Sequence, residues 1–313
     1  MKIKQNKFII FTFLILFVLI GYSFYQYFVE HFSYIQFYYE VKDVCYEKGN
    51  MDNKVCRHFR DKEDVKKFLI RDEPKKRYQE IDAITLTCEI VENTKFSLLQ
   101  LFSPLLILIA FIGTVHSDFT SGMFKYKLQR MTYKDYLKTL SKVILKVSLL
   151  IPVTLLLVFI FSIFITRFNF HVLDEVKGRS VYESFKYSHF ILYGGILCII
   201  QFLLNILYCN IGLYVCKKNK NKIVAIVMGF VYYLLVYLFV YLIVYVVFIN
   251  KILGIKELTD YFNISGYWFF DIQESAFYYI LISFILALLS SLFIIKVYKN
   301  KEEVIVAHES QMS

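Results

Sequence analysis

The stretch VILKVSLLIPVTLLLVFIFSIFI runs from Val143 to Ile165 and carries a single charge, Lys146. With 23 residues it is longer than the roughly 20 that an α-helix needs to cross a hydrocarbon core. Lipid offers backbone groups no hydrogen-bond partner, so a spanning segment must bond to itself. The stretch is therefore predicted to be a transmembrane helix.

Five further apolar runs of similar length are found along the chain: Phe8 to Phe28, Leu98 to Val115, Phe190 to Val215, Ile223 to Ile249, and Ala276 to Ile295. The 313 residues are accordingly 58% hydrophobic, with a mean hydropathy of +0.51, whereas soluble domains are usually about 45–50% apolar. This excludes a soluble enzyme, a nucleic-acid-binding domain and a disordered chain. A β-barrel is disfavoured because its strands alternate and are only about 10 residues long. We expect an all-α integral membrane protein with six transmembrane helices, in which Pro104 and Pro152 bend their spans.

The charges of the short connections predict the orientation. Four segments expected on one side hold 16 Lys and Arg residues in total: 1–7, 116–142, 216–222 and 296–313. The connections expected on the other side hold six: 166–189 and 250–275. Short basic loops stay in the cytoplasm, so both termini are expected there. The net charge of +10 then needs no nucleic acid, because the basic face meets anionic lipid or an acidic partner.

This orientation divides the chain into three parts. Residues 1–28 form a basic segment and the first span, which we interpret as an uncleaved anchor because its apolar run is too long for a signal peptide. Residues 29–97 form one large extracytoplasmic loop. Residues 98–313 form the core of the second to sixth spans, with a cytoplasmic loop at 116–142.

The extracytoplasmic loop is the only candidate for a soluble module. Asp61 opens a helix-like piece that ends at Ile70. A strand-like alternation of apolar residues follows it: Ile84, Leu86, Cys88 and Ile90. With about 70 residues, the loop is too small to bury a robust core alone.

Three of the six cysteines lie in this loop, namely Cys45, Cys56 and Cys88. Outside the membrane, Cys45 and Cys56 could close a short loop by a disulfide bond. The alternative is that these thiols are unpaired, and the odd number leaves one thiol over in either case. A metal site is disfavoured, because His58 alone does not complete a set of four ligands.

Motifs for catalysis are missing from the sequence. It contains no Gly-x-x-x-x-Gly-Lys-Ser/Thr loop, no His-Glu-x-x-His and no Gly-x-Ser-x-Gly. No Asp or Glu lies inside a predicted span, which disfavours a carboxylate proton relay and an intramembrane enzyme. We expect a non-enzyme that binds no cofactor or metal itself and takes any energy for work from another chain.

Two stripes within the predicted spans are candidates for a translocation pathway. On the fourth run, small and amide residues fall within an arc of roughly 80°: Gly194, Cys198, Gln201, Asn205, Cys209 and Gly212. On the fifth run, tyrosines recur every four residues: Tyr233, Tyr237, Tyr241 and Tyr245. Such residues also pack helices against one another. Each stripe is therefore either a packing surface, which is favoured, or a wall of a pathway.

The connection from Asn250 to Ser275 combines aromatic rings with acidic residues. It fits a short interfacial or re-entrant element, and it fits an ordinary belt of aromatic residues at the headgroups equally well.

The loop HSDFTSGMFKYKLQRMTYKDYLKTLSK, from His116 to Lys142, resembles the connection after the second span in ABC-2 type permeases, the membrane subunits of one class of ABC transporter. Members of that family carry an acidic residue, a glycine four positions on, a short amphipathic helix, a basic residue near a turn and a lysine opening the third span. Those places are taken here by Asp118, Gly122, Arg130 and Lys142. The usual proline before the basic turn is replaced by Gln129. The six spans with both ends inside extend the resemblance over most of the chain.

The resemblance implies that this loop is a coupling helix that docks in a groove of a separate ATP-binding subunit, which carries ATP and Mg²⁺. Besides the four motif residues, it assigns contacts to Met123, Phe124, Leu128, Tyr133, Lys134, Tyr136 and Lys138. It further implies a homodimer, or a pair with a related permease, that exports a peptide, a lipid or a hydrophobic compound. The expected location is the plasma membrane of a bacterium.

A different class of function is also compatible with the sequence. A membrane-anchored binding or immunity protein would use its extracytoplasmic loop to capture a peptide or an envelope component without transport. An ATPase that purifies with the chain would distinguish the two.

Overall fold

The structure is a computed structural model that describes residues 7–71, 82–92, 94–120, 123–170, 186–240 and 276–305. This part of the chain is mostly helical and contains no strand. Six of its helical segments are long and apolar enough to cross a membrane: Lys7–Glu47, Leu101–Asp118, Tyr133–Ile165, Phe190–Lys218, Lys222–Phe239 and Tyr279–Val297. The predicted six-span helical membrane protein is thereby confirmed in its class, and each span overlaps one predicted run.

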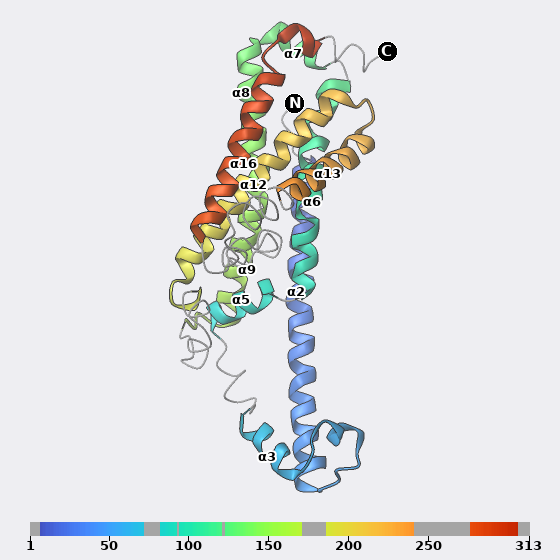
Figure 1. Cartoon of the computed structure of the whole chain (residues 1–313), viewed down its shortest axis with the longest axis vertical. Coiled ribbons are helices and arrows are strands. Elements are labelled where there is room, and N and C mark those ends of the chain that lie inside the picture. Colours follow the sequence, from blue (N-terminus) through green and yellow to red (C-terminus); the bar gives the residue numbers. More distant parts are fainter. Residues whose placement is uncertain are drawn as a thin grey trace, which may run out of the picture.

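The fourth span is the helix around which the others are arranged. It is formed by α12 (Phe190–Lys218), which packs against α6 (Thr94–Thr120), α8 (Tyr133–Ser148), α9 (Leu150–Ile165), α13 (Lys222–Phe239) and α16 (Ala276–Val297). The first span, α2 (Lys7–Glu40), packs mainly against α6 (Figure 1). The start of α2 and the end of α16 lie at the same end of the bundle, which we call the terminal end.

Small residues bring these helices together. A Cβ placed on Gly113 of α6 would lie 2.5 Å from Cγ of Phe8 on α2. A Cβ on Gly212 of α12 would lie 3.0 Å from the ring of Phe111. At position 113 any side chain larger than the hydrogen of glycine would displace the phenyl ring of Phe8. Small residues of this kind allow helices to approach each other closely in lipid.

The third span is divided at Leu149, and Pro152 is the cause. Proline has no N–H, so the carbonyl of Ser148, four residues earlier, lacks its helical partner. Asn205 of α12 supplies the missing donor, because its Nδ2 lies 3.0 Å from that carbonyl oxygen. The break between α8 and α9 lies where Pro152 was expected to bend the span. Pro104, by contrast, sits inside α6 without ending it.

The first span does not stop at Phe28, the end of the predicted run. The 34 residues of α2 make a helix of about 51 Å, whereas a hydrocarbon core is about 30 Å thick. Beyond α5 the helix continues to a small group of described elements at its tip (Figure 1). These are the π-helix η1 (Val41–Glu47), the 3-10 helix η2 (Lys54–His58) and α3 (Lys62–Arg71).

The helix predicted from Asp61 to Ile70 is confirmed as α3. Its start is set by the Asp61 carboxylate, which accepts hydrogen bonds from the backbone N–H groups of Glu63 at 2.9 Å and Asp64 at 2.8 Å. A side-chain oxygen in this position satisfies donors that have no partner within the helix.

The strand predicted at Ile84, Leu86, Cys88 and Ile90 is wrong. These residues lie in helix α5 (Ala83–Glu92). The Asp82 carboxylate caps the helix, since it accepts from the N–H groups of Ile84 at 2.8 Å and Thr85 at 2.9 Å. Four of its buried residues, Ala83, Leu86, Thr87 and Ile90, follow the spacing of one helix face, and Cys88 is buried beside them. Alternation over so short a segment predicts a strand but does not exclude a helix, and the segment packs on α9 as a helix.

Candidate functional site

The loop that resembles a coupling helix folds at the terminal end of the bundle. It consists of helix α7 (Met123–Arg130), a short turn and the beginning of α8 (Figure 1). The hydroxyl of Thr132 accepts a hydrogen bond from the N–H of Asp135 at 3.2 Å and donates to the Asp135 carboxylate at 2.7 Å. This reciprocal cap fixes where α8 begins.

A buried ion pair joins α7 to the end of α6. The Lys127 ammonium donates to the Asp118 carboxylate, and the two side chains retain only 14% and 11% of their exposure. Because water is largely excluded, the attraction between them is screened far less than that of a surface pair. Asp118, chosen from the sequence for its place in the motif, thus holds α7 against the bundle.

A chain of hydrogen bonds joins α8 to α16 and α12. The Tyr133 hydroxyl donates to the Tyr298 carbonyl at 2.7 Å, and the Tyr298 hydroxyl donates to the Leu213 carbonyl at 3.0 Å. The Lys217 ammonium donates to the Val297 carbonyl at 3.0 Å. Burial raises the pKa of Tyr298 well above its usual value, so the phenol keeps the proton that it donates.

The turn between α12 and α13 lies at the same end. A ring nitrogen of His116 on α6, Nε2, lies 3.0 Å from the Asn219 carbonyl, and the Lys222 ammonium lies 3.4 Å from the centre of the Phe8 ring. Contacts at this end therefore involve residues from, or directly next to, all six spans.

Several residues predicted to contact a partner face outward here, and others do not. Arg130, Lys134, Lys138 and Lys142 are exposed, as is Tyr126, which the sequence had not singled out. Leu128 and Tyr133 are partly buried. Met123 and Phe124 lie in the first turn of α7, and Gly122 lies outside the described residues.

Tyr136, predicted as another contact for a partner, is only 1% exposed. Its ring belongs to the packed core of the chain. The residue lies on the inner side of α8, one turn from Thr132, so its role is internal.

The stripe of small and amide residues on α12 has two kinds of surroundings: some of its residues pack against neighbouring helices, and others line a cavity. Asn205 is fully buried and gives its amide to the Ser148 carbonyl, as a packing surface requires. Gln201 is also buried, at 2% exposure. At the end away from α7, Gly194 and Cys198 line a largely apolar cavity of about 350 Å³ between α5, α9 and α12.

Cys88 of α5 faces the same cavity together with Lys186, and both are 4% exposed. Burial raises the pKa of Cys88 to about 12. The thiol therefore stays protonated and is a poor nucleophile at neutral pH. The sequence had placed Cys88 on a strand, so this wall of the cavity could not be predicted from it.

The tyrosine stripe on α13 is described only in part. Tyr233 is buried and its ring meets that of Tyr208 on α12 edge to face, with centroids 4.9 Å apart. Tyr237 is half-buried. Tyr241, Tyr245 and the aromatic connection from Asn250 to Ser275 lie outside the described residues.

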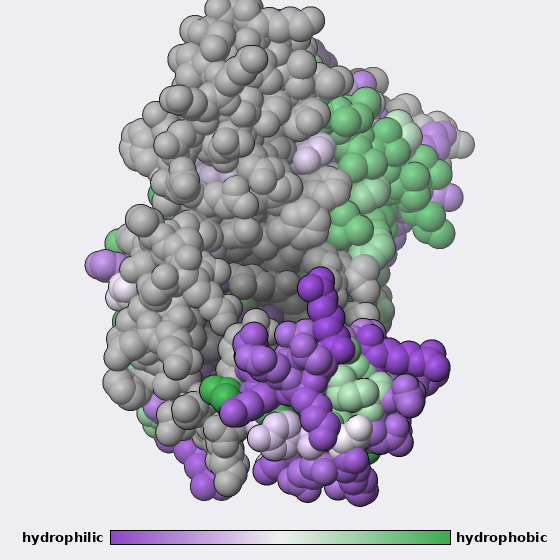
Figure 2. Space-filling view, turned by 60° about the horizontal axis from the view of Figure 1, so that its bottom comes forward, coloured by the Kyte–Doolittle hydropathy of each residue, from purple (hydrophilic) through white to green (hydrophobic). Residues whose placement is uncertain are grey.

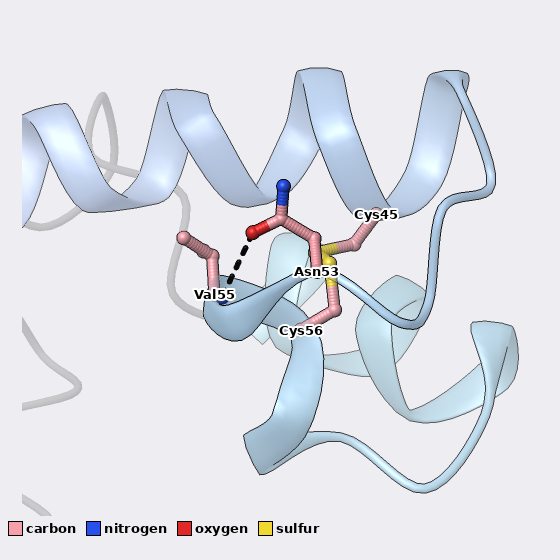
Figure 3. The surroundings of a disulfide bond; sticks show 4 residues. All are labelled: Cys45, Asn53, Val55 and Cys56. Carbon is pink, nitrogen blue, oxygen red and sulfur yellow. Dashed lines mark hydrogen bonds between the residues drawn. A yellow bond between two sulfur atoms is a disulfide. The ribbon is translucent and has the colours of Figure 1, made fainter.

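At the tip of α2, Cys45 and Cys56 form a disulfide bond (Figure 3). The bond joins η1 to η2, and the Asn53 side chain caps η2 by accepting from the N–H of Val55 at 3.2 Å. The two cysteines form a small buried core with Val41 and Val65. We call residues 41–71 the tip module.

The surface of the tip module differs from that of the bundle. Viewed from this end, the module is predominantly hydrophilic with a paler patch at its centre, whereas hydrophobic side chains gather on the bundle behind it (Figure 2). An exposed ion pair lies on the module, between Lys48 and Asp43 at 2.6 Å. The module therefore has a surface suited to water.

Within the described ranges, no group of three or more His, Cys, Asp or Glu side chains is placed to hold a metal ion. Comparison of the chain with family models, with curated proteins and with solved structures finds no match.

Proposed function

We propose that this chain is the permease subunit of an ABC exporter of the ABC-2 type, and that a separate subunit binds and hydrolyses ATP with Mg²⁺. The observation that carries the proposal is the construction of the loop between α6 and α8. Its outer side presents exposed cations and a tyrosine, while its inner side is bonded to α6 and α16. A partner that binds the outer side and moves this loop would therefore also displace α6 and α16.

In this proposal the terminal end faces the cytoplasm. Most of the Lys and Arg residues of the short connections belong to segments at this end, and such loops resist translocation. Both termini then lie inside the cell, residues 29–97 lie outside it, and the protein is a multi-pass component of the plasma membrane of a bacterium.

The exposed residues form what we call the coupling surface, namely Tyr126, Arg130, Lys134 and Lys138. An aromatic ring beside Arg and Lys side chains is typical of the core and rim of a protein interface. The partner that fits is an ATP-binding subunit with an acidic groove. Electrostatic attraction would speed the encounter and set the register.

A displacement of the coupling surface would travel along two routes. The buried Asp118–Lys127 pair carries it to α6, and the hydrogen bond from Tyr133 carries it to α16 and, through Tyr298, to α12. These are discrete contacts between rigid helices, which is the physical requirement for coupling two distant sites. ATP binding on the partner would thereby rock spans on both sides of α12.

The cargo in this proposal is a peptide, a lipid or a hydrophobic compound. The cavity between α5, α9 and α12 is largely apolar, with the buried Lys186 and Cys88 in its lining. A second copy of the chain, or a related permease, would complete the pathway.

The test is purification of the chain from the cells that make it, from which an ATP-binding subunit should co-purify. Lys134→Glu combined with Lys138→Glu reverses two exposed charges and should abolish the complex and the ATPase stimulation. Lys66→Glu combined with Lys67→Glu makes the same change on α3 of the tip module, where both residues are exposed, and should leave the complex intact. Retention of the complex and of full ATPase stimulation by the first variant would overturn the proposal.

A second function is favoured by one observation, the disulfide-closed tip module at the end of a long helix. Under this alternative the chain is a membrane-anchored binding or immunity protein that captures a ligand without transport. In that case no ATP-binding subunit would co-purify, and substitutions on the module alone would abolish activity.

A further inference from the structure

A pocket opens at the terminal end of the bundle, between the end of α6 and the turn that joins α12 to α13. It has a volume of about 460 Å³ and is lined by His116, Ser117, Lys220, Asn221 and Lys222. Pockets that bind small ligands usually measure about 300–1,000 Å³. We call it the basic pocket, because two of these described residues are lysines and none of them is acidic.

The protein does not neutralise the two lysines of the basic pocket. Within the described part of the chain, neither ammonium group lies within ion-pair distance of a carboxylate. The Lys222 ammonium instead lies 3.4 Å from the centre of the Phe8 ring, which holds it in place but carries no net charge. Two cations that line one pocket repel each other, so the pocket favours an anion.

The other polar groups of the pocket fix the turn and add a hydrogen-bond donor. A carbonyl oxygen only accepts, so the His116 Nε2 that lies 3.0 Å from the Asn219 carbonyl must carry the hydrogen, and this bond ties the turn to α6. Oδ1 of Asn221 accepts from the N–H of Ile223 at 2.8 Å, so the Nδ2 donor lies on the other side of the amide. Ammonium and amide donors match the oxygen atoms of a phosphate group, which only accept.

The basic pocket lies where three spans end. The span Leu101–Asp118 ends and the span Lys222–Phe239 begins at its lining residues, and the span Phe190–Lys218 ends two residues before Lys220. In a membrane, the ends of spans reach the depth of the lipid headgroups. The anions nearest to such a position are the phosphates of phospholipids.

Apolar side chains continue from the pocket into α13. Ile223 and Val224 follow Lys222 directly and are 71% and 45% exposed, and Val227, about one turn on, is 54% exposed. The acyl chains of a lipid whose headgroup occupies the pocket would cover such side chains, whereas a free phosphate ion would not. Cations beside exposed apolar side chains therefore favour a lipid over a soluble phosphate.

The sequence before Phe8 adds positive charge next to the pocket. Lys2, Lys4 and Lys7 precede Phe8, and the first acidic residue of the chain is Glu30. This N-terminal segment therefore contains no carboxylate that could neutralise Lys220 or Lys222, and its own lysines are attracted to the same anionic lipids.

From these observations we infer that the basic pocket binds the headgroup phosphate of one anionic phospholipid, whose acyl chains lie along α13. A basic surface as a whole attracts anionic lipid diffusely, whereas this inference assigns one lipid to defined residues. The bound headgroup would join the end of α6 to the turn before α13. The inference goes beyond the proposed function, since it holds equally for an exporter and for an anchored binding protein.

Native mass spectrometry of the full-length protein in detergent tests this assignment. Dioleoyl phosphatidylglycerol should form an adduct of one lipid per chain, more tightly than dioleoyl phosphatidylcholine, which has no net charge. Lys220→Gln combined with Lys222→Gln should lower the affinity for phosphatidylglycerol roughly tenfold. Lys299→Gln combined with Lys301→Gln removes two exposed lysines with the same spacing, outside the pocket lining, and should leave the affinity unchanged. Equal affinity for the two lipids, no loss in the first variant, or equal losses in both would overturn the inference.

Two further measurements separate the charge from the fold and the lipid from a free ion. Lys220→Arg combined with Lys222→Arg keeps both charges and should retain the adduct, so its loss in this variant would contradict the assignment. Excess inorganic phosphate should not displace the lipid. A phosphate adduct that replaces the lipid would show that the pocket takes a soluble ion and would also overturn the inference. The protein is purified without any ATP-binding subunit, so these results are independent of the test of the coupling surface.

Discussion

The two ends of this molecule are held together in different ways. At the terminal end, α6, α7, α8, α12 and α16 are joined by bonds between residues far apart in the sequence, such as Tyr133 and Tyr298. The tip module is built from one short segment, closed by the Cys45–Cys56 bond, and among the described residues it packs on the end of α2. The first arrangement links several spans and, in the proposed function, passes a displacement to them, whereas the tip module adjoins only the first span and is expected to unfold separately from the bundle.

The difference predicts which end fails when one bond is removed. Four experiments test this difference between the terminal end and the tip module. They follow in order of the expected effect, from the largest to the smallest.

The largest effect is expected from Cys45→Ser combined with Cys56→Ser. A disulfide across a separation of 11 residues stabilises the tip module by about 3 kcal/mol in the loop-entropy model, and its core is too small to compensate. Limited proteolysis should cut the variant within residues 41–71, while the bundle keeps its melting temperature. A bundle that melts with the module would contradict this separate unfolding.

The next effect concerns two Lys–Asp pairs, one at each end. Lys127→Met leaves the Asp118 carboxylate buried without its cation, which should lower the unfolding free energy by about 2 kcal/mol, less than for a fully enclosed pair. Lys48→Met removes the exposed partner of Asp43 and should change it by less than about 0.5 kcal/mol. Thermal unfolding in detergent compares them, and equal losses would show that burial does not distinguish the two ends.

A smaller effect is expected from Tyr133→Phe, which removes only the hydroxyl that donates to the Tyr298 carbonyl. The loss should be about 1 kcal/mol, with the fold retained. If the hydrogen bond also transmits force, ATPase stimulation by the partner should fall while the complex still forms. Unchanged stimulation would remove this route from the mechanism.

The smallest effect concerns how fast the Cys88 thiol reacts with an alkylating reagent. The pKa of Cys88 is raised to about 12 by burial, so at neutral pH its thiol is protonated and should resist iodoacetamide. Reduction should open the tip module and expose its two thiols, so mass spectrometry should then find Cys45 and Cys56 alkylated but Cys88 intact. Raising the pH toward 9 should increase its modification only slightly. Rapid alkylation at pH 7.5 would show that the helix α5 does not seal the cavity.

Part of the terminal end could be read from the sequence. Asp118 was identified by its place in the loop pattern, and the exposed Lys134 and Lys138 by their charge. Their partners could not be identified, because Lys127 is one of many lysines and Tyr298 one of 26 tyrosines. Tyr136 resembled an exposed aromatic contact until folding placed it inside, since sequence alone does not say which face of α8 meets α12.

The tip module and α5 show the same limit at the other end. The helix at Asp61 was predicted from a local capping pattern. The pairing of Cys45 with Cys56 was one of two alternatives that the sequence left open, and the structure decided between them. The strand expected at residues 84–90 became a helix because α9 offered a surface that a helix covers.

The sequence by itself determined how many segments are long and apolar enough to cross a membrane as helices, because such a run has no other stable conformation in lipid. It also determined where α3 begins and where the third span breaks, since both depend on neighbours within four residues. Only the tertiary structure decided that Asn205 satisfies the carbonyl that Pro152 leaves without a donor, that Lys127 pairs with Asp118, and that Lys220 and Lys222 line one pocket with His116. These outcomes depend on which helices become neighbours, and that is settled by packing over the whole chain rather than by any local pattern.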